Sequence, residues 1–168
     1  MVGPADDNHA RMTLWGSLEA KFGSTPFRTF VFWPIAVFLY ELVNEGPDFS
    51  ILPFGLVFLV WGYGQDRYAG AFRTKRGGGG PGIANPPQRL VAEGLYAYVR
   101  NPMYLGHLIF IYGLALTFKS WLALAILIFH MWWFHRRVLE DEVRMRALFG
   151  RSYDDYASHV KRWIPGFF

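Results

Sequence analysis

Four apolar runs constrain the fold of this chain more than any other feature. They cover approximately residues 27–43, 49–64, 103–118 and 120–134. Each run is at or slightly below the ~20 residues that an α-helix needs to cross a bilayer. The 168-residue chain is 52% hydrophobic and only 18% charged, so the runs predict an all-α, polytopic membrane protein with about four transmembrane helices. A soluble bundle of buried helices is the alternative interpretation.

The basic residues are distributed unequally around these runs. Sixteen of the seventeen Lys and Arg residues lie near the start of the first run, between the second and third, or after the fourth. Only Lys119 lies on the other side. The positive-inside rule therefore predicts that both termini and the long middle loop are cytoplasmic. We interpret the net charge of +4 as attraction to an anionic membrane surface and not to nucleic acid.

The last two runs are joined by Lys119-Ser120 alone. Such a short link predicts a tight antiparallel hairpin, with Ser120 as the N-cap of its second helix. Apolar residues then continue at helical spacing as far as Gly150, a typical helix stop. The fourth helix should therefore extend beyond the membrane as a cytoplasmic C-terminal helical tail.

A polar turn leads directly into the third run, over residues 93–106. Asn101 is a preferred N-cap residue and Pro102 a preferred first helical residue. A helix that begins here would point free backbone N–H groups and its positive dipole end at any ligand in front of it. The turn therefore predicts a site for an anionic or polar group beside the membrane.

A second polar cluster, from Arg137 to Glu142, follows the fourth run. It is open to two interpretations. The charges would form a solvated face with Glu140–Arg144 and Glu142–Arg146 pairs, or they would face the polar turn across a small pocket, because the hairpin brings the two ends together. In that pocket helix-start amides suit a carboxylate, and acidic groups suit an ammonium or ribose hydroxyls. Gly106 would allow close approach of a ligand, and Tyr104 would stack on it or donate a hydrogen bond.

Several other kinds of site are excluded or disfavoured. The chain has no cysteine, which excludes disulfides, thiolate nucleophiles and cysteine-based metal sites. His107, His130 and His135 match no metal-ligand spacing, so we predict no metal site. The glycine-rich segment 76–82 lacks the Lys-Ser/Thr ending of a phosphate-binding loop and is expected to be a linker.

The two polar segments resemble those of a known family. Arg100-Asn101-Pro102-Met103-Tyr104-Leu105-Gly106 resembles the Arg-His-Pro-x-Tyr-x-Gly motif of integral-membrane methyltransferases, the isoprenylcysteine carboxyl methyltransferase and phospholipid N-methyltransferase relatives. Arg137-x-x-x-Asp141-Glu142, Phe149-Gly150-x-x-Tyr153-x-x-Tyr156 and Arg162-Trp163-Ile164-Pro165 resemble their C-terminal region. Asn101 replaces the family histidine and Asp141 the first glutamate. Because an asparagine side chain does not titrate near neutral pH, Asn101 is not expected to act as a general base.

The resemblance implies a methyltransferase that uses S-adenosyl-L-methionine. Its substrate would be a lipid-like acceptor from the bilayer: an isoprenylcysteine carboxylate or a related O, N or S acceptor, or alternatively a phospholipid amine such as ethanolamine. It implies catalytic roles for Arg100 and Glu142, although Arg100 is also open to interpretation as a positive-inside anchor. It implies cofactor binding by Tyr98, Asn101, Pro102, Met103, Tyr104, Leu105, Gly106, Arg137, Asp141 and Glu142. A membrane reductase of the sterol-reductase type and a non-enzymatic membrane scaffold or transporter are the alternative functions.

Together these observations predict one membrane domain over residues 1–168. Its parts are an N-terminal cytoplasmic segment at 1–26, the first two spans at 27–64, a cytoplasmic loop at 65–100 and a cofactor-binding half at 101–168. The active site is expected on the cytoplasmic side.

Overall fold

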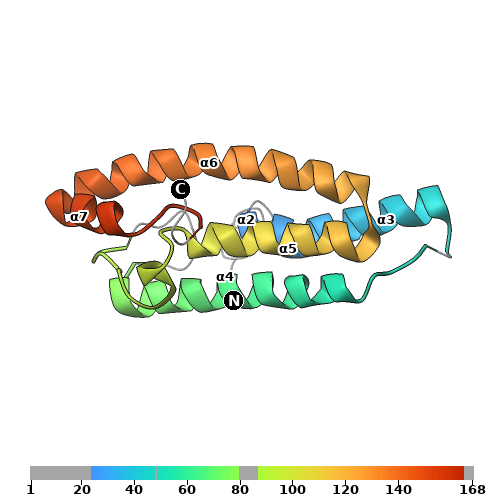
Figure 1. The fold of residues 1–168 in the computed structure, drawn as a ribbon, viewed down its shortest axis with the longest axis horizontal. Coiled ribbons are helices and arrows are strands. Elements are labelled where there is room, and N and C mark those ends of the chain that lie inside the picture. Colours follow the sequence, from blue (N-terminus) through green and yellow to red (C-terminus); the bar gives the residue numbers. More distant parts are fainter. Residues whose placement is uncertain (1–23, 48, 80–86, 165–168) are drawn as a thin grey trace, which may run out of the picture.

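The computed structural model describes residues 24–47, 49–79 and 87–164, which form an all-α bundle (Figure 1). Within these residues the chain forms no strand, only an isolated bridge between Val99 and Lys161. The expected all-α class is therefore confirmed, whereas most of the segment 1–26 lies outside the described residues. The elements in order are α2 (Thr25–Phe27), the π-helix η1 (Arg28–Phe32), α3 (Trp33–Glu45), α4 (Phe54–Gly77), the 3-10 helix η2 (Gly94–Ala97), α5 (Pro102–Phe118), α6 (Trp121–Phe149) and α7 (Arg151–His159).

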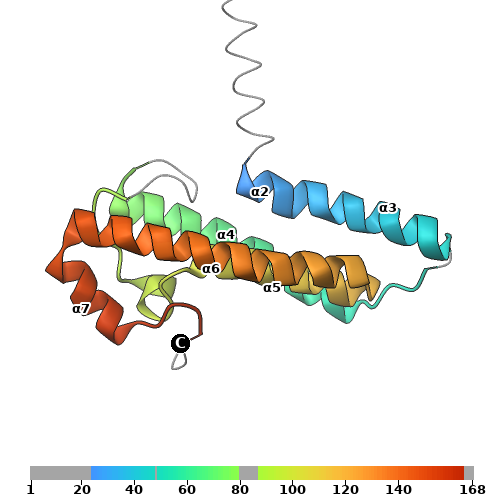
Figure 2. The same ribbon diagram turned by 90° about the horizontal axis from the view of Figure 1, so that it is seen from above.

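Helix α5 lies at the centre of the bundle. It runs between α4 and α6, and α2, η1 and α3 follow one side of the three (Figures 1 and 2). The most extensive contact between helices is that of α4 with α5. An apolar core of Val37, Ile111, Leu114 and Ala123, all at most 1% exposed, joins α3, α5 and α6. This core packs the C-terminal half of α5 against α3 and the start of α6.

Glycines allow α4 and α5 to approach each other closely. A Cβ atom on Gly62 would lie 2.5 Å from the carbonyl oxygen of Gly106 and from the amide nitrogen of Phe110. A Cβ atom on Gly106 would lie 2.8 Å from the carbonyl oxygen of Gly62 and 2.9 Å from the amide nitrogen of Asp66. Only a residue without a side chain fits such a backbone-to-backbone contact. The close approach expected at Gly106 is thus to helix α4 and not to a ligand.

The predicted hairpin is confirmed. Helix α5 ends at Phe118 and α6 begins at Trp121, with Lys119 in the left-handed region at φ 51°. The hydroxyl of Ser120 accepts a hydrogen bond of 3.1 Å from the amide of Ala123, which makes it the N-cap of α6. Gly150, at φ 53°, ends α6 where the sequence indicated.

Helix α4 differs from the prediction at both ends. It begins at Phe54, preceded by Pro53, and it continues to Gly77. The first thirteen residues of the expected loop, 65–77, are therefore helical. Hydropathy falls after Gly64, but residues such as Gln65, Arg67 and Tyr68 still favour or tolerate a helix. The end of the apolar run marks where α4 becomes polar and not where it ends.

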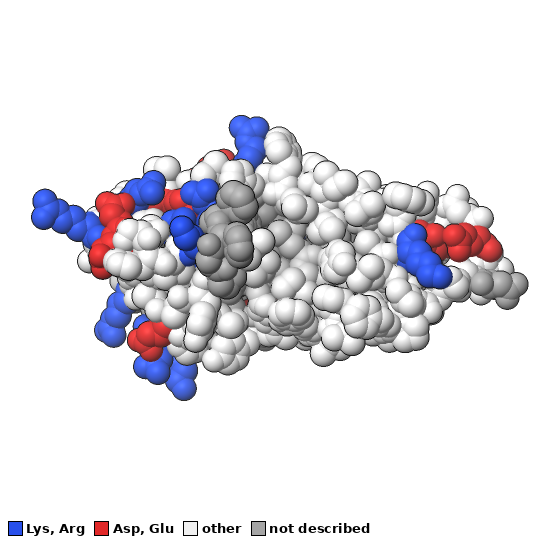
Figure 3. Space-filling model, viewed as in Figure 1, with Lys and Arg blue, Asp and Glu red and all other residues white. Residues whose placement is uncertain are grey.

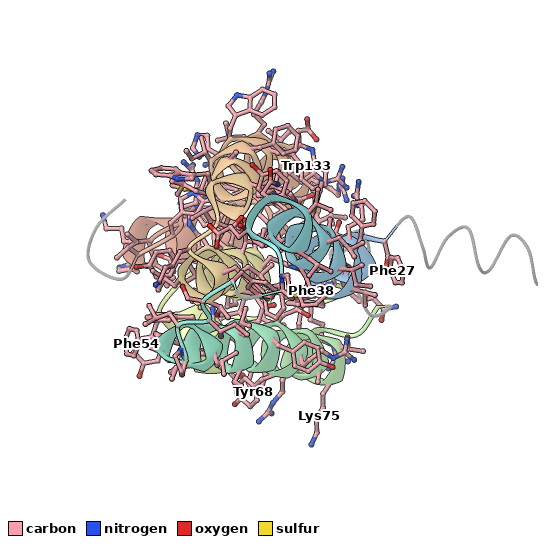
Figure 4. All side chains as sticks on the ribbon, turned by 90° about the vertical axis from the view of Figure 1, so that its right-hand side faces the viewer. Phe27, Phe38, Phe54, Tyr68, Lys75 and Trp133 are labelled. Atoms are coloured by element: carbon pink, nitrogen blue, oxygen red, sulfur yellow. The ribbon has the colours of Figure 1, made fainter. Side chains whose placement is uncertain are left out.

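Two of the described helical segments are long and apolar enough to cross a membrane, Thr25–Glu45 and Trp121–Phe149. Pro102–Phe118 is apolar but has only 17 residues. Helix α4 has 24 residues, but it is too polar to be counted with the first two. In the view of Figure 3, charged side chains gather at the end of the bundle where α6 meets α7, with a smaller group at the opposite end. Figure 4 looks along the bundle and shows Phe54 and Tyr68 projecting outward from α4.

Candidate functional site

A pocket of about 750 Å³, open to solvent, lies at the charged end of the bundle. It is bounded by the start of α5, the C-terminal part of α6, helix α7 and the segment that precedes α5. Its lining residues are Arg73, Pro87, Leu90, Val91, Tyr96, Arg100, Asn101, Pro102, Met103, Tyr104, Asp141, Glu142, Arg144, Met145, Tyr153 and Tyr156.

The start of α5 forms one wall of the pocket. Pro102 is the first helical residue, as predicted, and Leu105 donates the first backbone hydrogen bond to the carbonyl of Asn101, at 3.0 Å. The amides of Met103 and Tyr104 precede that bond and belong to the helix start. Asn101 makes no side-chain cap. Its Nδ2 donates instead to the carbonyl of Arg162 at 3.2 Å, because the extended segment after α7 lies beside it.

The opposite wall is formed by α6, and Tyr104 connects the two. The hydroxyl of Tyr104 donates to Oδ2 of Asp141 at 2.7 Å. The other carboxylate oxygen, Oδ1, lies 3.5 Å from Arg144 and 4.0 Å from Nε of Arg137. Tyr104 packs on Phe134 with 4.9 Å between ring centroids. The hairpin therefore brings the two polar segments of the sequence into direct contact.

Glu142 lies between two arginines. Arg162 donates to both of its carboxylate oxygens, at 2.7 and 2.9 Å, and Arg100 approaches Oε1 at 3.2 Å. The side chain of Glu142 is 5% exposed and that of Arg100 is 10% exposed. Two guanidinium groups on one carboxylate leave a net positive charge at the pocket wall. The Nε atom of Arg100 is buried and has no hydrogen-bond partner among the described residues.

Helix α7 and the residues that follow it complete the pocket. The hydroxyl of Tyr156 donates to the carbonyl of Tyr96 at 2.6 Å, which fixes η2 against α7. The Arg100 amide donates to the carbonyl of Lys161 at 2.9 Å. Burial raises the pKa of Tyr153 and of Tyr156, so both hydroxyls stay protonated at neutral pH. They add neutral hydroxyls to the pocket and no charge, and the hydrogen of the Tyr156 hydroxyl is already donated to Tyr96.

The structure gathers most of the residues predicted for the site. Of the candidate set, the pocket is lined by Arg100, Asn101, Pro102, Met103, Tyr104, Asp141 and Glu142. Four candidates lie outside the lining. Tyr98 is 67% exposed, Leu105 and Gly106 are on later turns of α5, and Arg137 faces Glu140 and Asp141 along α6. The predicted Glu142–Arg146 pair is not formed, because Glu142 is bonded to Arg100 and Arg162.

Some lining residues were absent from the predicted set. Tyr153 and Tyr156 belong to the family-like tail, and their spacing i, i+3 places both on one face of α7, so the sequence did carry a signal for them. Arg73, Leu90 and Val91 come from the interval expected to be a loop, and nothing in their spacing indicated a pocket. Within the described residues, no three His, Asp or Glu side chains are grouped as a metal site would require.

Comparisons with known proteins agree with this geometry. The profile of the phospholipid methyltransferase family matches residues 54–152, from the start of α4 to the start of α7. Those 99 residues are more than half of the 168-residue chain. They include the helix start, the hairpin and the acidic end of α6.

Individual relatives agree as well. The chain is 32% identical over 82 residues to protein-S-isoprenylcysteine O-methyltransferase of Schizosaccharomyces pombe, over 48% of this chain and 35% of that protein. It is 31% identical over 78 residues to a probable protein-S-isoprenylcysteine O-methyltransferase of Oryza sativa subsp. indica, over 46% of this chain and 41% of that protein. Against protein-S-isoprenylcysteine O-methyltransferase B of Arabidopsis thaliana it is 32% identical over 80 residues, with 46% and 40% covered. These matches span well under half of the length of each relative. Because the family profile matches more than half of this chain, the chain belongs to the phospholipid methyltransferase family.

Proposed function

We propose that this protein is a membrane methyltransferase that uses S-adenosylmethionine and methylates a lipid-like acceptor from the bilayer. The observation that carries the proposal is the composition of the pocket. It combines helix-start amides and a buried guanidinium with unsatisfied Nε on one side, and a carboxylate on the other. That arrangement suits a zwitterionic ligand that also carries an apolar base.

The residues present fit this methyl donor. The amides of Met103 and Tyr104, together with Arg100, would hold its carboxylate. Asp141, oriented by Tyr104 at 2.7 Å, would hold the ammonium group or the ribose hydroxyls. The apolar lining would cover the adenine ring, and it includes Pro87, Leu90, Val91 and Met145.

When bound, the donor supplies an electrophilic methyl group. The protein's own contribution is orientation and exclusion of water, because in-line attack on a sulfonium methyl by a carboxylate needs no proton transfer. The Arg100–Glu142–Arg162 cluster keeps a positive charge fixed at the pocket wall, where it would attract an anionic acceptor. Asn101 holds the carbonyl of Arg162, so its role is to position the chain and not to move protons.

The leading acceptor is the carboxylate of an isoprenylcysteine, on the strength of the three relatives named for that reaction. A phospholipid amine is the second candidate acceptor, in line with the description of the matched family. In the membrane we propose four spans, with α4 and α5 completing the two helices that are long enough by themselves. Large apolar side chains exposed on the first half of α4 support this, among them Phe54 at 61% and Val60 at 74%.

Two measurements with detergent-purified protein test the proposal. S-adenosylhomocysteine should raise the thermal midpoint, because it binds only the folded state. Labelled methyl from the donor should then appear in a prenylated-peptide pool when the protein is supplied with both that pool and total lipid. Label in the phospholipid pool alone would replace the leading acceptor by the second. Absence of S-adenosylhomocysteine binding by folded protein would overturn the proposed function itself.

A further inference from the structure

A buried polar pair lies one helical turn below the pocket. Oδ1 of Asp66, on α4, is 3.4 Å from Nε2 of His107, on α5. The two side chains are 2% and 0% exposed. His107 follows the pocket-lining residue Met103 by four positions, so the two side chains project from the same face of α5. The pair therefore lies between α4 and α5, one turn further along α5 than the pocket-lining residue Met103.

Three polar atoms of this pair have no hydrogen bond. Neither ring nitrogen of His107 has a partner among the described residues, and neither has Oδ1 of Asp66. The separation of 3.4 Å is too long for a strong hydrogen bond. Buried polar groups in native proteins are nearly always bonded, and ionisable groups inside a membrane protein usually serve a function. A ligand that supplies both a hydrogen-bond donor and an acceptor would satisfy the ring nitrogens of His107 and Oδ1 of Asp66.

The other buried histidine of the bundle provides a contrast. His130, on α6, is 3% exposed, and its Nδ1 lies 2.8 Å from the carbonyl oxygen of Ile126. Its polar capacity is thus partly satisfied within its own helix. Lack of partners is therefore a property of the position of His107 and not of every buried histidine here.

An irregular helical segment packs against His107. The ring of Phe30 stacks on that of His107, with 4.7 Å between centroids and 20° between planes. Phe30 belongs to η1, a π-helix, and short π-helical segments occur often at functional sites. The neighbouring Thr29 is fully buried, and its hydroxyl also has no partner among the described residues. The apolar ring of Phe30, on a wide helical turn, thus covers the polar ring of His107. A ligand that displaced Phe30 would reach His107.

We propose that Asp66 and His107 form the subsite for the polar head of the acceptor, which takes the place of Phe30 as it enters from the bilayer. This inference rests on the proposed function and names the chemistry of its acceptor. A neutral imidazole offers one donor and one acceptor, and a carboxylate offers acceptors. An acylated amino acid that carries a hydrocarbon chain has the matching amide N–H and carbonyl groups. The pair would bind that amide and so select for it.

Two acceptor probes that differ only in the amide test this inference. N-acetyl-S-farnesylcysteine carries the amide, and S-farnesylthiopropionic acid lacks it. We expect the folded protein to bind the first at least tenfold more tightly, by equilibrium binding without donor. Asp66→Leu and His107→Phe, which remove the polar atoms, should each abolish that preference, while the affinity for S-adenosylhomocysteine changes less than twofold. His130→Phe is the matched control and should keep the preference.

Thermal stability separates this role from a purely structural one. An unsatisfied pair does not hold α4 against α5, so His107→Phe should leave the thermal midpoint of the unliganded protein unchanged or raised. If His107→Phe does not fold, Phe30→Ala tests the inference instead. Loss of the Phe30 ring that stacks on His107 should tighten binding of the amide probe. The inference is overturned if the original protein does not prefer the amide probe, or if His107→Phe retains the preference. Failure to bind S-adenosylhomocysteine would instead overturn the proposed function.

Discussion

At the scale of single residues, the hydrogen bond from Tyr104 to Asp141 holds the two walls of the pocket in register. Tyr104→Phe removes the hydroxyl and keeps the ring that packs on Phe134. Loss of this bond to a charged group is expected to cost about 1.5 kcal/mol of ligand binding, or roughly tenfold in affinity. Isothermal titration with S-adenosylhomocysteine measures it. Tyr98→Phe is the control, since Tyr98 is 67% exposed and outside the pocket, and an equal loss there would contradict the assignment.

Among the residues that the structure describes, Glu142 is the only carboxylate that contacts both Arg100 and Arg162. Glu142→Gln leaves two guanidinium groups facing each other at the pocket wall, so the free energy of unfolding should fall. Loss of one partner of a buried pair costs about 3–5 kcal/mol. Because Arg162 is 27% exposed and solvent screens it, we expect roughly 2 kcal/mol. Glu140→Gln, at a carboxylate 68% exposed, should leave the thermal midpoint unchanged; equal midpoints for the two variants would refute a stabilising role.

The sequence predicted Tyr104 and Asp141 as partners in one site because the hairpin fixes their relation. Both residues lie within about two helical turns of the point where α5 and α6 meet the pocket. Regular helical geometry therefore brings their side chains to the same site. It did not predict the partners of Glu142. Arg162 lies twenty residues further along the chain, and its position depends on the turn at Gly150, on α7 and on the extended segment beyond it. No local periodicity carries that information.

At the scale of helices, the turn between α5 and α6 depends on one cap. Ser120→Ala removes the hydroxyl that accepts from the amide of Ala123 at 3.1 Å. Loss of such a cap costs about 1 kcal/mol. Ser158→Ala, which removes an exposed hydroxyl within α7, is the comparison. Thermal unfolding in detergent should show a lower midpoint for the first variant alone, and no difference between the two would argue against the cap.

The contact of α4 with α5 offers a sharper comparison on a single helix. Gly62→Ala places a Cβ atom 2.5 Å from the backbone of Gly106, whereas Gly64→Ala meets nothing within 4 Å. The first change should destabilise the protein by about 1–3 kcal/mol, because two helix backbones would have to move apart. The second should be neutral or slightly stabilising, since alanine favours a helix. Thermal midpoints of the two variants check this, and the reverse order would refute the close contact.

Helix boundaries show where sequence patterns succeed and where they fail. The end of α6 was predictable because Gly150 adopts a conformation that other residues avoid. The end of α4 was not, because hydropathy reports the surroundings of a helix and not its hydrogen bonds. Residues 65–77 continue the helix while their surroundings become polar. Pocket residues such as Arg73 were missed for this reason.

At the scale of the whole molecule, the charge distribution predicts which side of the membrane the pocket faces. The chain has no cysteine, so single cysteines can report sidedness without background. Ser152→Cys, exposed on α7 near the pocket, should react with a membrane-impermeant thiol reagent only after intact cells are opened. Ser50→Cys, exposed beside Lys119, should react in intact cells. Labelling with the opposite pattern would invert the proposed orientation.

The segment after α7 has a consequence for how the site could be inactivated. Val99 pairs with Lys161, and Arg162 reaches Glu142, so this segment supports residues of the pocket without belonging to any long helix. Proteolytic cleavage between α7 and Lys161 would leave every long helix of the bundle intact. It would separate Arg162 from the chain that carries Glu142, and it would free the Arg100 amide from the carbonyl of Lys161. A single cut in a short extended segment would therefore impair ligand binding while the bundle itself stays assembled.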